Sequence, residues 1–501
     1  MRLAELLGPV SLENTDPMLE ITGLTADSRD VQPGFLFGAF SGAQSDGAQY
    51  IPDACRKGAR VILLSPAAAA KCRRECAGSA VLLLADPNPR RRYAELAARF
   101  YGAQPDRIAA VTGTNGKTSV AEFCRQIWTQ LGRRSASIGT LGVRGNHPEA
   151  GLERAGHVHT TPPPEILNAV LARLAHGGVT HVSLEASSHG LAQYRLDGVK
   201  LAAAALTNIT RDHMDYHADA AAYMYAKLRL FGEVLRPGGV AVLNREDASY
   251  SEAEALSWAR GHTIISVGGR FGDLRIVRSE PHAKGQRLRI AYGERQWEVE
   301  LSLIGRFQAM NALTAAALVI GCGEDPDDVM GALPGLKGVP GRLQVAGHTV
   351  SGATVLVDYA HTPEALRTVL EAVRPFCSGR LHVLFGCGGE RDRGKRPLMG
   401  AAAATLADHV IITDDNPRSE DPAAIRASIL AACPGAAEIA GRAEAIRAGV
   451  ANLAVNDMLI LAGKGHETGQ EIAGTVYPFD DCVEVRRALE MEAEGAGDGR
   501  N

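Results

Sequence analysis

The sequence predicts an α/β protein of three domains. These are a smaller N-terminal α/β domain, a central domain with a mostly parallel sheet and flanking helices, and a C-terminal Rossmann-like α/β domain. Three observations predict this class. The chain has 501 residues, enough for about three domains of usual size. Two turn-rich segments divide it, and apolar strands alternate with helical segments on both sides of the second division.

Composition and charge exclude several classes of protein. Hydrophobic residues make up 46% and charged residues 22% of the chain, which is typical of a globular protein and not of a disordered or collagen-like one. The net charge of −4 lacks the basic excess of a duplex nucleic-acid binder. No apolar stretch approaches the ~18 residues of a membrane span. The nine cysteines are scattered without a CxxC pair, which indicates a reduced compartment.

These properties predict a cytoplasmic chain without nucleic-acid or membrane partners. The N-terminal residues contain no apolar run of the length found in signal peptides. We expect a monomer.

Two segments mark the expected domain boundaries. One is YGAQPDR at 101–107, which follows an apolar helix at Tyr93–Phe100. The other is the glycine-rich GLKGVPGR at 335–342. Segments of this composition are typical of linkers. The expected domains are therefore residues 1–103, 104–337 and 338–501.

The central part alternates strands and helices. Apolar strands are expected at Ile108–Val111, Val182–Leu184, Ala202–Leu206 and Val240–Leu243. After the first of these, apolar residues recur at 120, 123, 124, 127, 128 and 131. This spacing predicts an amphipathic helix with one buried face.

The C-terminal part repeats the pattern. Strands are expected at Val355–Val357, Leu381–Phe385, Val410–Ile412 and Met458–Leu461, and helices at 363–374, 396–407 and 422–432. Strand–helix alternation predicts a parallel sheet covered on both faces. From about residue 490 the chain becomes a polar tail, which we expect to be mobile.

A glycine-rich loop follows the first central strand and opens the helix after it. Its residues are Gly113, Thr114, Asn115, Gly116, Lys117, Thr118 and Ser119. Backbone N–H groups in such a loop can surround phosphate oxygens. We expect Lys117 to reach the terminal phosphates and the Thr118 hydroxyl to ligate Mg²⁺. The loop is tighter than the P-loop consensus, and the alternative is a plain glycine turn. The central domain is thus predicted to be of the P-loop type.

Two further segments offer metal ligands. Glu185 ends a strand, where ligands of parallel sheets bind. Asp212 and His213 follow another strand, and Mg²⁺ prefers oxygen ligands such as carboxylates. The alternatives for His213 are a zinc pair with His217 or a structural role. Lys227 resembles an ordinary lysine of an amphipathic helix.

Three charged loops follow strands of the C-terminal domain, at 386–397, 414–421 and 462–467. They should share one rim of the sheet. Arg391, Arg418 and Lys464 in these loops suit a substrate carboxylate or phosphate, because Arg can hold such a group with two hydrogen bonds. The alternative is that the loops are charged only because they are exposed.

The ordered motifs resemble those of the Mur ligase family. TGTNGKTS, LEASSHG, TNITRDHMDYH, GRFQAMNALTAA, PGRLQ and DYAHTP occur in the family's order and cover nearly the whole chain. TADSR, HTTPPP, GCGGERDRGKRP and DNPR are most similar to members that add meso-diaminopimelate. One departure is Gln308, where many relatives have Asn.

The resemblance implies an ATP-dependent amide ligase of peptidoglycan precursor synthesis. It implies that UDP-N-acetylmuramoyl-L-alanyl-D-glutamate and meso-diaminopimelate are the substrates, and that ATP and Mg²⁺, at two sites, are required. Lys227 matches the lysine that the family carbamylates with CO₂, which reverses its reading from the pattern alone. Lys117, Lys227 and His213 would be catalytic. Glu185, His213 and Lys227 would join Thr118 as metal ligands.

The resemblance also assigns the binding residues. Ser28 would contact the uridine nucleotide. The muramoyl-dipeptide would be bound by Thr160, Thr161, Ser187, Gln193 and Arg195. The nucleotide would be bound by the loop residues with Asn311, Arg342 and Asp358. The diaminopimelate pocket would consist of Arg391, Asp415, Asn416, Arg418, Gly463 and Glu467.

Three alternatives remain. A family member that adds L-lysine would perform the same reaction. A folylpolyglutamate synthetase-like ligase would share the ATP chemistry but need a pteridine pocket. A P-loop switch or regulatory ATPase would hydrolyse ATP without an amino acid.

Overall fold

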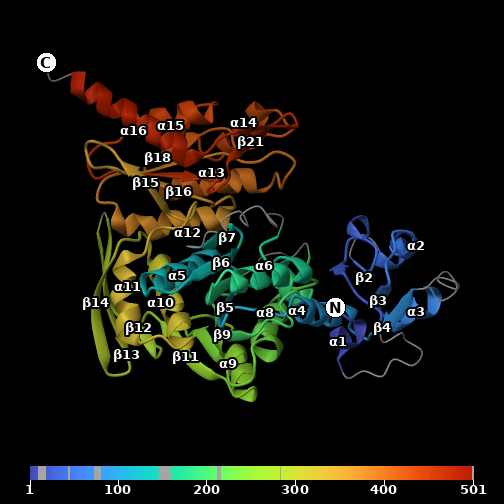
Figure 1. Cartoon of the computed structure of the whole chain (residues 1–501). Helices are drawn as coiled ribbons and strands as arrows, with labels where there is room; N and C mark the ends of the chain where they lie inside the picture. Colours follow the sequence, from blue (N-terminus) through green and yellow to red (C-terminus); the bar gives the residue numbers. More distant parts are fainter. Residues whose placement is uncertain are drawn as a thin grey trace. The chain divides into compact units, whose positions relative to one another are not determined.

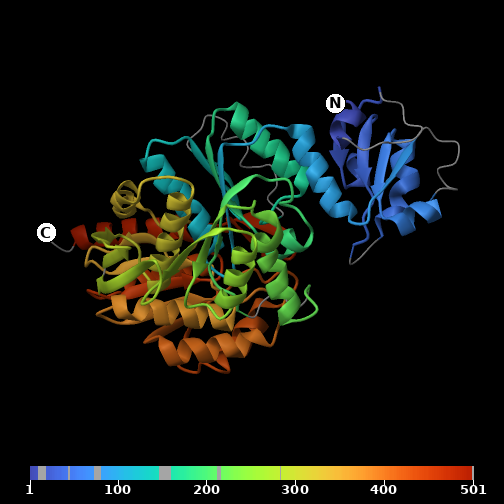
Figure 2. The ribbon, with the colours of Figure 1, turned by 90° about the horizontal axis from the view of Figure 1, so that it is seen from below.

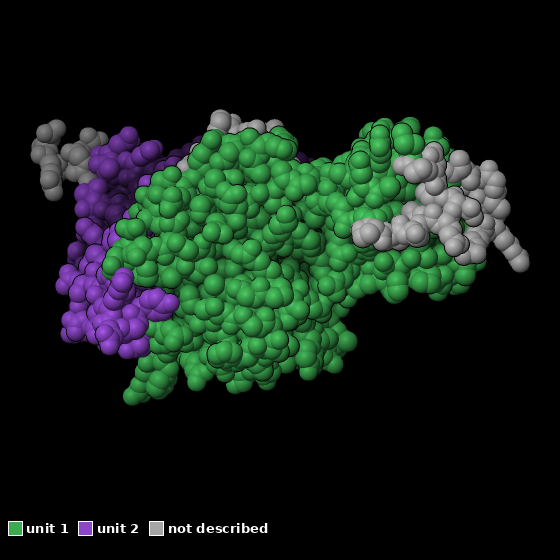
Figure 3. Space-filling view, turned by 60° about the horizontal axis from the view of Figure 1, so that its bottom comes forward, with its two compact units in different colours: residues 1–274, 313–329 green, residues 275–312, 330–501 purple. Residues whose placement is uncertain are grey.

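The computed structural model describes residues 1–8, 18–42, 46–72, 81–145, 159–210, 216–282 and 284–498. The chain forms two compact units (Figure 3). Unit 1 contains Met1–Leu274 and Leu313–Val329, and unit 2 contains Arg275–Ala312 and Met330–Asn501. The chain passes from one unit to the other after Leu274 and again within helices α10 (Arg306–Gly321) and α11 (Pro326–Ala332). The three domains named above, with their two boundaries, stay a prediction.

The N-terminal part of unit 1 is a four-stranded parallel sheet (Figure 2). Its strands, in spatial order, are β1 (Gly23–Thr25), β2 (Phe35–Gly38), β3 (Val61–Leu64) and β4 (Leu82–Ala85). Its helices are α1 (Leu3–Leu7), α2 (Ile51–Arg56), α3 (Pro66–Cys72) and α4 (Pro89–Tyr101), with short turns η1 (Ser28–Asp30) and η2 (Gly47–Tyr50). Two apolar clusters, one with residues of α1 and α4 and one with residues of α2 and α3, cover the two faces of the sheet.

The rest of unit 1 is built on a larger, mostly parallel sheet (Figure 1). Its strands, in spatial order, are β11 (Thr263–Gly268), β10 (Val240–Asn244), β9 (Leu201–Leu206), β5 (Arg107–Thr112), β8 (His181–Glu185), β6 (Ser135–Gly139) and β7 (Gly142–Gly145). Only β7 is antiparallel to its neighbour. The helices are α5 (Lys117–Gln130), α6 (Pro164–His176), α7 (Ser188–Ala192), α8 (Ala220–Arg229), η4 (Leu230–Val234) and α9 (Tyr250–Ala259). The four predicted strands and the predicted amphipathic helix are confirmed.

Unit 2 contains the predicted C-terminal sheet, in the order β15-β16-β20-β17-β18-β19. The strands are β15 (Gln344–His348), β16 (Thr354–Asp358), β17 (Leu381–Phe385), β18 (His409–Ile412), β19 (Ala437–Glu438) and β20 (Met458–Ala462). The helices are α12 (Pro363–Val373), α13 (Lys395–Leu406), α14 (Pro422–Leu430), α15 (Arg442–Ala451) and α16 (Asp481–Asp498), with turns η5 (Leu333–Gly335) and η6 (Arg374–Phe376). Only β15 is antiparallel, so the carboxyl ends of the other strands share one rim.

Two antiparallel features of unit 2 were not predicted. One is the run β12 (Leu274–His282), β13 (Gly285–Tyr292) and β14 (Arg295–Leu301), and the other is the hairpin β21 (Gly469–Ile472) and β22 (Thr475–Pro478). At the C-terminal end, α16 continues to Asp498, beyond the point where a tail was expected. A fully buried ion pair between Arg442 and Asp481, with N–O distances of 2.7 Å, fastens the start of α16 to α15.

The α/β class predicted from the sequence is confirmed. Within the described ranges, no helix combines the length and the apolar character that crossing a membrane requires.

Candidate active site

The glycine-rich loop lies between β5 and α5, as predicted. Gly113 and Gly116 have φ angles of +149° and +89°, which residues with a side chain rarely adopt. A Cβ atom on Gly113 would lie 1.8 Å from the Thr207 hydroxyl oxygen. Glycine is therefore required at this position both by the backbone conformation and by the close approach of β9.

The segment after β9 fixes the loop from the side. The Thr114 N–H donates to the Asn208 carbonyl oxygen at 2.7 Å, and the Asn115 N–H donates to the Asn208 side-chain oxygen at 3.0 Å. The Thr207 hydroxyl donates to the Asn115 carbonyl oxygen at 2.6 Å. Asn208 was not among the predicted site residues, although its position just beyond an apolar strand is a signal for one.

Lys117 and Thr118 begin α5. The Lys117 Nζ donates to the carbonyl oxygens of Gly113 and Thr114, each at 2.8 Å, so the lysine folds over the loop whose N–H groups it would assist. The Thr118 hydroxyl donates to Glu185 Oε2 at 3.0 Å. Glu185, at the carboxyl end of β8, pairs with Val111 of the adjacent strand β5, which leads into the loop before α5. A hydroxyl and a carboxylate side by side are oxygen ligands of the kind Mg²⁺ prefers.

Thr140 orients the Glu185 carboxylate. Thr140 was not among the predicted site residues. Its N–H donates to Oε1 at 2.8 Å and its hydroxyl to Oε2 at 3.3 Å. Its hydroxyl also lies 3.2 Å from that of the predicted Thr160. Thr140 follows β6, so its position at the end of a strand was the available signal.

Lys227 is not an ordinary lysine on a helix surface. It is 1% exposed, its Nζ donates to the Gly113 carbonyl oxygen at 2.7 Å, and it lies 4.5 Å from the centre of the Tyr223 ring. The reading from the helical pattern alone was therefore wrong. The Tyr223 hydroxyl also lies 3.0 Å from the Thr114 hydroxyl, so α8 contacts the loop through two side chains.

Of the two histidines considered for metal binding, only His217 lies within the described residues. His213 and Asp212 lie outside the described residues. His217 is buried among the rings of His189, Tyr216 and Tyr223. Within the described ranges, no group of three or more His, Cys, Asp or Glu side chains is arranged to hold a metal ion, so the zinc alternative gains no support there.

The residues predicted for the muramoyl-dipeptide form one hydrogen-bonded group. The Thr161 hydroxyl donates to the Glu185 carbonyl oxygen at 2.8 Å and lies 3.0 Å from the Ser187 hydroxyl. Arg195 donates to the Thr161 carbonyl oxygen at 2.6 Å and to the Gln193 side-chain oxygen at 2.8 Å. The residues predicted to bind the dipeptide thus join Glu185 through its backbone carbonyl oxygen.

Two cavities are lined by neighbours in the sequence of Ser28, the residue predicted to contact the uridine nucleotide. The Ser28 carbonyl oxygen accepts a hydrogen bond from Lys57 Nζ at 2.8 Å. One cavity, of about 420 Å³, is lined by Thr25, Arg29 and Phe35 among others. The other, of about 210 Å³, is lined by Ala26, Asp27, Phe40, Arg90, Tyr93, Pro163, Pro164, Glu165, Gln193 and Arg195. The second cavity therefore joins the TADSR segment to the predicted dipeptide residues.

In unit 2, the residues predicted for the nucleotide also lie together. The Asn311 side-chain N–H donates to the Gln308 side-chain oxygen at 3.1 Å, and Gln308 donates to the Arg342 carbonyl oxygen at 2.8 Å. The Asp358 carboxylate accepts from the Leu343 and Ala360 N–H groups, each at 2.8 Å. Gln308 thus connects Asn311 to the PGRLQ segment.

Burial shifts the pKa values of this cluster. It raises the pKa of Asp358 above its ordinary value, while Arg342 acts in the opposite direction. It lowers the pKa of His466 to about 4, and the Arg342 charge adds to this. The Arg342 guanidinium stacks over the Tyr359 ring, 4.9 Å from its centre. His466 is therefore neutral at pH 7.

The three charged loops share the rim at the carboxyl ends of β17, β18 and β20, as predicted. Lys464, however, is fully buried. Its Nζ donates to the Asn416 side-chain oxygen at 3.0 Å and to Glu467 Oε2 at 3.4 Å, and lies 3.6 Å from Asp415. Its own loop and the DNPR loop enclose it, and the expectation that Lys464 offers its charge to a substrate stays a prediction. Lys464 organises the predicted Asp415, Asn416 and Glu467.

Arg418 is held by the β21–β22 hairpin. It has a φ of +52°, and its Nε donates to Glu471 Oε2 at 3.0 Å while its Nη1 donates to the Gly389 carbonyl oxygen at 2.7 Å. Backbone bonds to Glu471 and from Ala473 hold the same residue. Glu471 was missed because the pairing depends on the hairpin.

Gly463, with φ +113°, lies beside Asp415, and Arg391 is exposed in the loop after β17.

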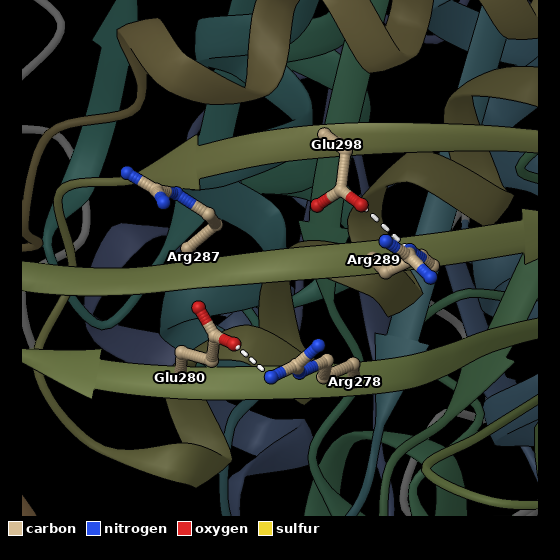
Figure 4. Close-up of a pocket in the computed structure, with 5 residues that line it drawn as sticks. All are labelled: Arg278, Glu280, Arg287, Arg289 and Glu298. Carbon is tan, nitrogen blue, oxygen red and sulfur yellow. Dashed lines mark hydrogen bonds and ion pairs between the residues drawn. The ribbon is translucent and has the colours of Figure 1, made fainter.

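One further cavity contains none of the predicted residues. It measures about 400 Å³ and lies on the exposed face of the β12–β14 run (Figure 4). Its five side chains are Arg278, Glu280, Arg287, Arg289 and Glu298. The Arg278–Glu280 and Arg289–Glu298 pairs, each at 2.6 Å, neutralise most of its charge. It is an exposed, ion-paired surface.

Three family profiles match the sequence. Residues 20–101 match "Mur ligase family, catalytic domain", residues 111–319 match "Mur ligase middle domain", and residues 341–465 match "Mur ligase, glutamate ligase domain".

The chain is also similar to known proteins over nearly its full length. A relative from Caulobacter vibrioides, named UDP-N-acetylmuramoyl-L-alanyl-D-glutamate--2,6-diaminopimelate ligase, is 50% identical over 95% of this chain and 96% of its own length. A solved structure of a ligase with the same name is 34% identical, covers 98% of this chain and 99% of its own, and has a TM-score of 0.75.

A more distant structure, a MurF ligase from Thermotoga maritima in complex with ADP, is 17% identical with a TM-score of 0.59 over 96% of this chain and 100% of its own. At this identity it shows the fold alone. The identity and coverage of the nearer relatives show more: the chain belongs to the Mur ligase family.

Proposed function

We propose that the chain is an ATP-dependent ligase that joins meso-diaminopimelate to UDP-N-acetylmuramoyl-L-alanyl-D-glutamate in peptidoglycan precursor synthesis. The observation that carries the proposal is the hydrogen bond between Thr118 and Glu185 beside the Lys117 loop. It supports a site for a metal-bound nucleotide next to the group that contains Thr161 and Ser187. The names of relatives that share half of their residues with this chain support the two substrates.

The chemical difficulty of the reaction is that a carboxylate resists attack by an amine, because its leaving group would be oxide. In the proposed reaction, an oxygen of the D-glutamyl side-chain carboxylate attacks the γ-phosphorus of ATP, and ADP leaves. The amine of diaminopimelate then attacks the carbonyl carbon of the acyl phosphate. Phosphate leaves with the transferred oxygen, and the nitrogen loses a proton.

The residues of unit 1 counter the repulsion between the carboxylate and the triphosphate. Lys117 and the N–H groups of the loop stabilise negative charge on the transferred phosphoryl group. Thr118 and Glu185, with His213 and Lys227 by resemblance, would hold Mg²⁺, which would neutralise phosphate charge when bound. The oxygen ligands present fit this ion.

We propose that Lys227 is carbamylated, in that its amine adds to CO₂ and releases a proton. A carbamate would turn this buried cation into an anionic oxygen ligand for a second Mg²⁺. It would keep one N–H, which is compatible with the hydrogen bond to the Gly113 carbonyl oxygen.

We propose that each of the three expected domains binds one substrate. Residues 1–103 would bind the uridine nucleotide, residues 104–337 ATP, and residues 338–501 diaminopimelate. Diaminopimelate differs from lysine by one carboxylate, and a site built for a polar group can discriminate by about 10⁴–10⁵. Arg418, with Asp415 and Asn416 beside it, would provide this discrimination. The protein would act as a cytoplasmic monomer.

The test is phosphate release by the purified chain with ATP, Mg²⁺ and the UDP-muramoyl-dipeptide. Parallel reactions contain meso-diaminopimelate, L-lysine or no amino acid, and mass spectrometry follows the tripeptide. The proposal predicts release and product only with diaminopimelate. Tripeptide product with lysine would support the amide-forming reaction but contradict the selectivity for diaminopimelate. Equal phosphate release in all three reactions would mean that the chain only hydrolyses ATP.

A further inference from the structure

Two arginines of unit 1 lie half-buried in one cavity without a carboxylate partner. Arg90 and Arg195 both line the cavity of about 210 Å³. Across the described ranges, neither forms an ion pair with Asp or Glu. By contrast, the more deeply buried Arg229, Arg396 and Arg442 each pair with a carboxylate within 3.1 Å.

The hydrogen bonds of these two arginines leave their charges uncompensated. Arg90 donates one N–H to the Ser41 carbonyl oxygen at 3.0 Å and stacks 5.1 Å above the Phe40 ring. Arg195 donates to the carbonyl oxygen of Thr161 and to the side-chain oxygen of Gln193. All of these acceptors are neutral. Because a half-buried cation is costly without a counter-charge, the pair favours an anion in the cavity.

Burial and neighbouring charges in the cavity also favour an anion there. Burial lowers the pKa of both arginines. The Arg90 charge lowers the pKa of Arg195 further, while Tyr216 and Glu165 act in the opposite direction. Glu165 also lines the cavity, but burial raises the pKa of its carboxyl group. Arg195 lowers the pKa of the same group, and this one carboxylate does not balance the charge of two guanidiniums.

The position of the cavity identifies the anion, given the proposed function on which this step rests. On one side lie Ala26 and Asp27 of the TADSR segment, which adjoins the residue expected at the uridine. On the other lie Gln193 and Arg195, expected at the muramoyl-dipeptide. In the substrate, the diphosphate lies between uridine and the muramoyl group. Arg90 is on the TADSR side, at the start of α4.

We propose that Arg90 binds the diphosphate of the UDP-linked substrate, facing Arg195 across the cavity. An Arg fork suits phosphate oxygens because it can donate two parallel hydrogen bonds. The stack on Phe40 and the bond to Ser41 hold the guanidinium in place before the substrate arrives, so little conformational freedom is lost on binding.

The test is calorimetric titration of the full chain with UDP and, separately, with UDP-muramoyl-dipeptide. The variants are Arg90→Ala, Arg90→Lys and the control Arg173→Ala, which removes an exposed arginine of α6. We expect Arg90→Ala to weaken both ligands by about 10- to 100-fold. Arg90→Lys should lose less, because it keeps the charge but not the fork, and Arg173→Ala should bind as the wild type does.

Unchanged affinity of Arg90→Ala for both ligands would overturn the proposal. A loss for the full substrate with none for UDP would also overturn it, because Arg90 would then bind a carboxylate of the peptide. If Arg90→Ala does not fold, the same comparison is made with Arg90→Lys. Failure of the proposed ligase function would appear separately, as wild-type protein that forms no tripeptide.

Discussion

At the scale of single residues, Lys117 has the most direct role in the proposed chemistry. Its Nζ lies over the loop that would surround the phosphates. Lys117→Ala removes a charge that acts on the transferred phosphoryl group, so we expect kcat to fall by about 10²–10³-fold or more. Phosphate release under saturating substrates measures this. The exposed Lys200→Ala serves as the control, and near-normal turnover by Lys117→Ala would refute the role.

Arg418 should decide between diaminopimelate and lysine. Arg418→Ala leaves the extra carboxylate of diaminopimelate without its partner, so the ratio of kcat/KM for diaminopimelate to that for lysine should fall by at least about 100-fold. Glu471→Gln should change the ratio in the same direction but less, because Glu471 only positions the guanidinium.

The measurement is tripeptide formation with each amine, and the exposed Arg367→Ala is the control. If Arg418→Ala leaves the ratio of kcat/KM for diaminopimelate to that for lysine unchanged, Arg418 does not determine the specificity. An effect of Glu471→Gln equal to that of Arg418→Ala would mean that Glu471 contacts the amino acid itself.

At the scale of structural elements, the loop between β5 and α5 depends on glycine. Gly113→Ala would place a Cβ atom 1.8 Å from the Thr207 hydroxyl at a φ of +149°. The loop must then move, and we expect nucleotide affinity to fall by at least about 10-fold. Gly132→Ala is the matched control, because Gly132 also has positive φ but no atom within 4 Å of its added Cβ. It should lose only about 1 kcal/mol of stability. Equal nucleotide affinity in the two variants would contradict this account.

The strands of the parallel sheets could be predicted because they are buried on both faces. Strands such as β9 and β20 are continuous apolar runs, which is typical of this environment. The β12–β14 run was missed because one face is exposed and carries Arg278, Arg289 and Glu298, so charges interrupt the apolar pattern. The hairpin β21–β22 was missed because it is mostly exposed and polar.

The candidate site was predictable only where its signal is local. Lys117 and Thr118 follow from the loop motif, because the phosphate-binding geometry is made by consecutive residues. Thr140 and Asn208 contact the site only because β6 and β9 lie near β5 in the sheet, and strand order cannot be read from spacing. The burial of Lys464 depends likewise on how two loops fold over one another.

At the scale of the whole molecule, the half-buried His466 lowers stability in acid. The pKa of His466 is about 4 in the folded chain against 6.5 as its ordinary value. Between these values the unfolded chain binds the extra proton, so stability falls as pH drops from about 6.5 towards 4. His466→Gln should therefore show a weaker loss of unfolding free energy between pH 7 and 4.5. We expect a difference of about 1–2 kcal/mol, since solvent screens the partly exposed ring.

Urea unfolding of both proteins at the two pH values measures this difference. The exposed His176→Gln is the control and should follow the wild type. The same pH dependence in His466→Gln and wild type would show that His466 is not held neutral by its surroundings.

The central claim is that the D-glutamyl carboxylate is activated by transfer of the γ-phosphoryl group. The most direct test uses UDP-muramoyl-dipeptide with ¹⁸O in that carboxylate, together with ATP, Mg²⁺ and meso-diaminopimelate. The account predicts that one ¹⁸O atom appears in inorganic phosphate for each amide bond formed, because the carboxylate oxygen leaves with the phosphoryl group. Amide product accompanied by phosphate without ¹⁸O would contradict it.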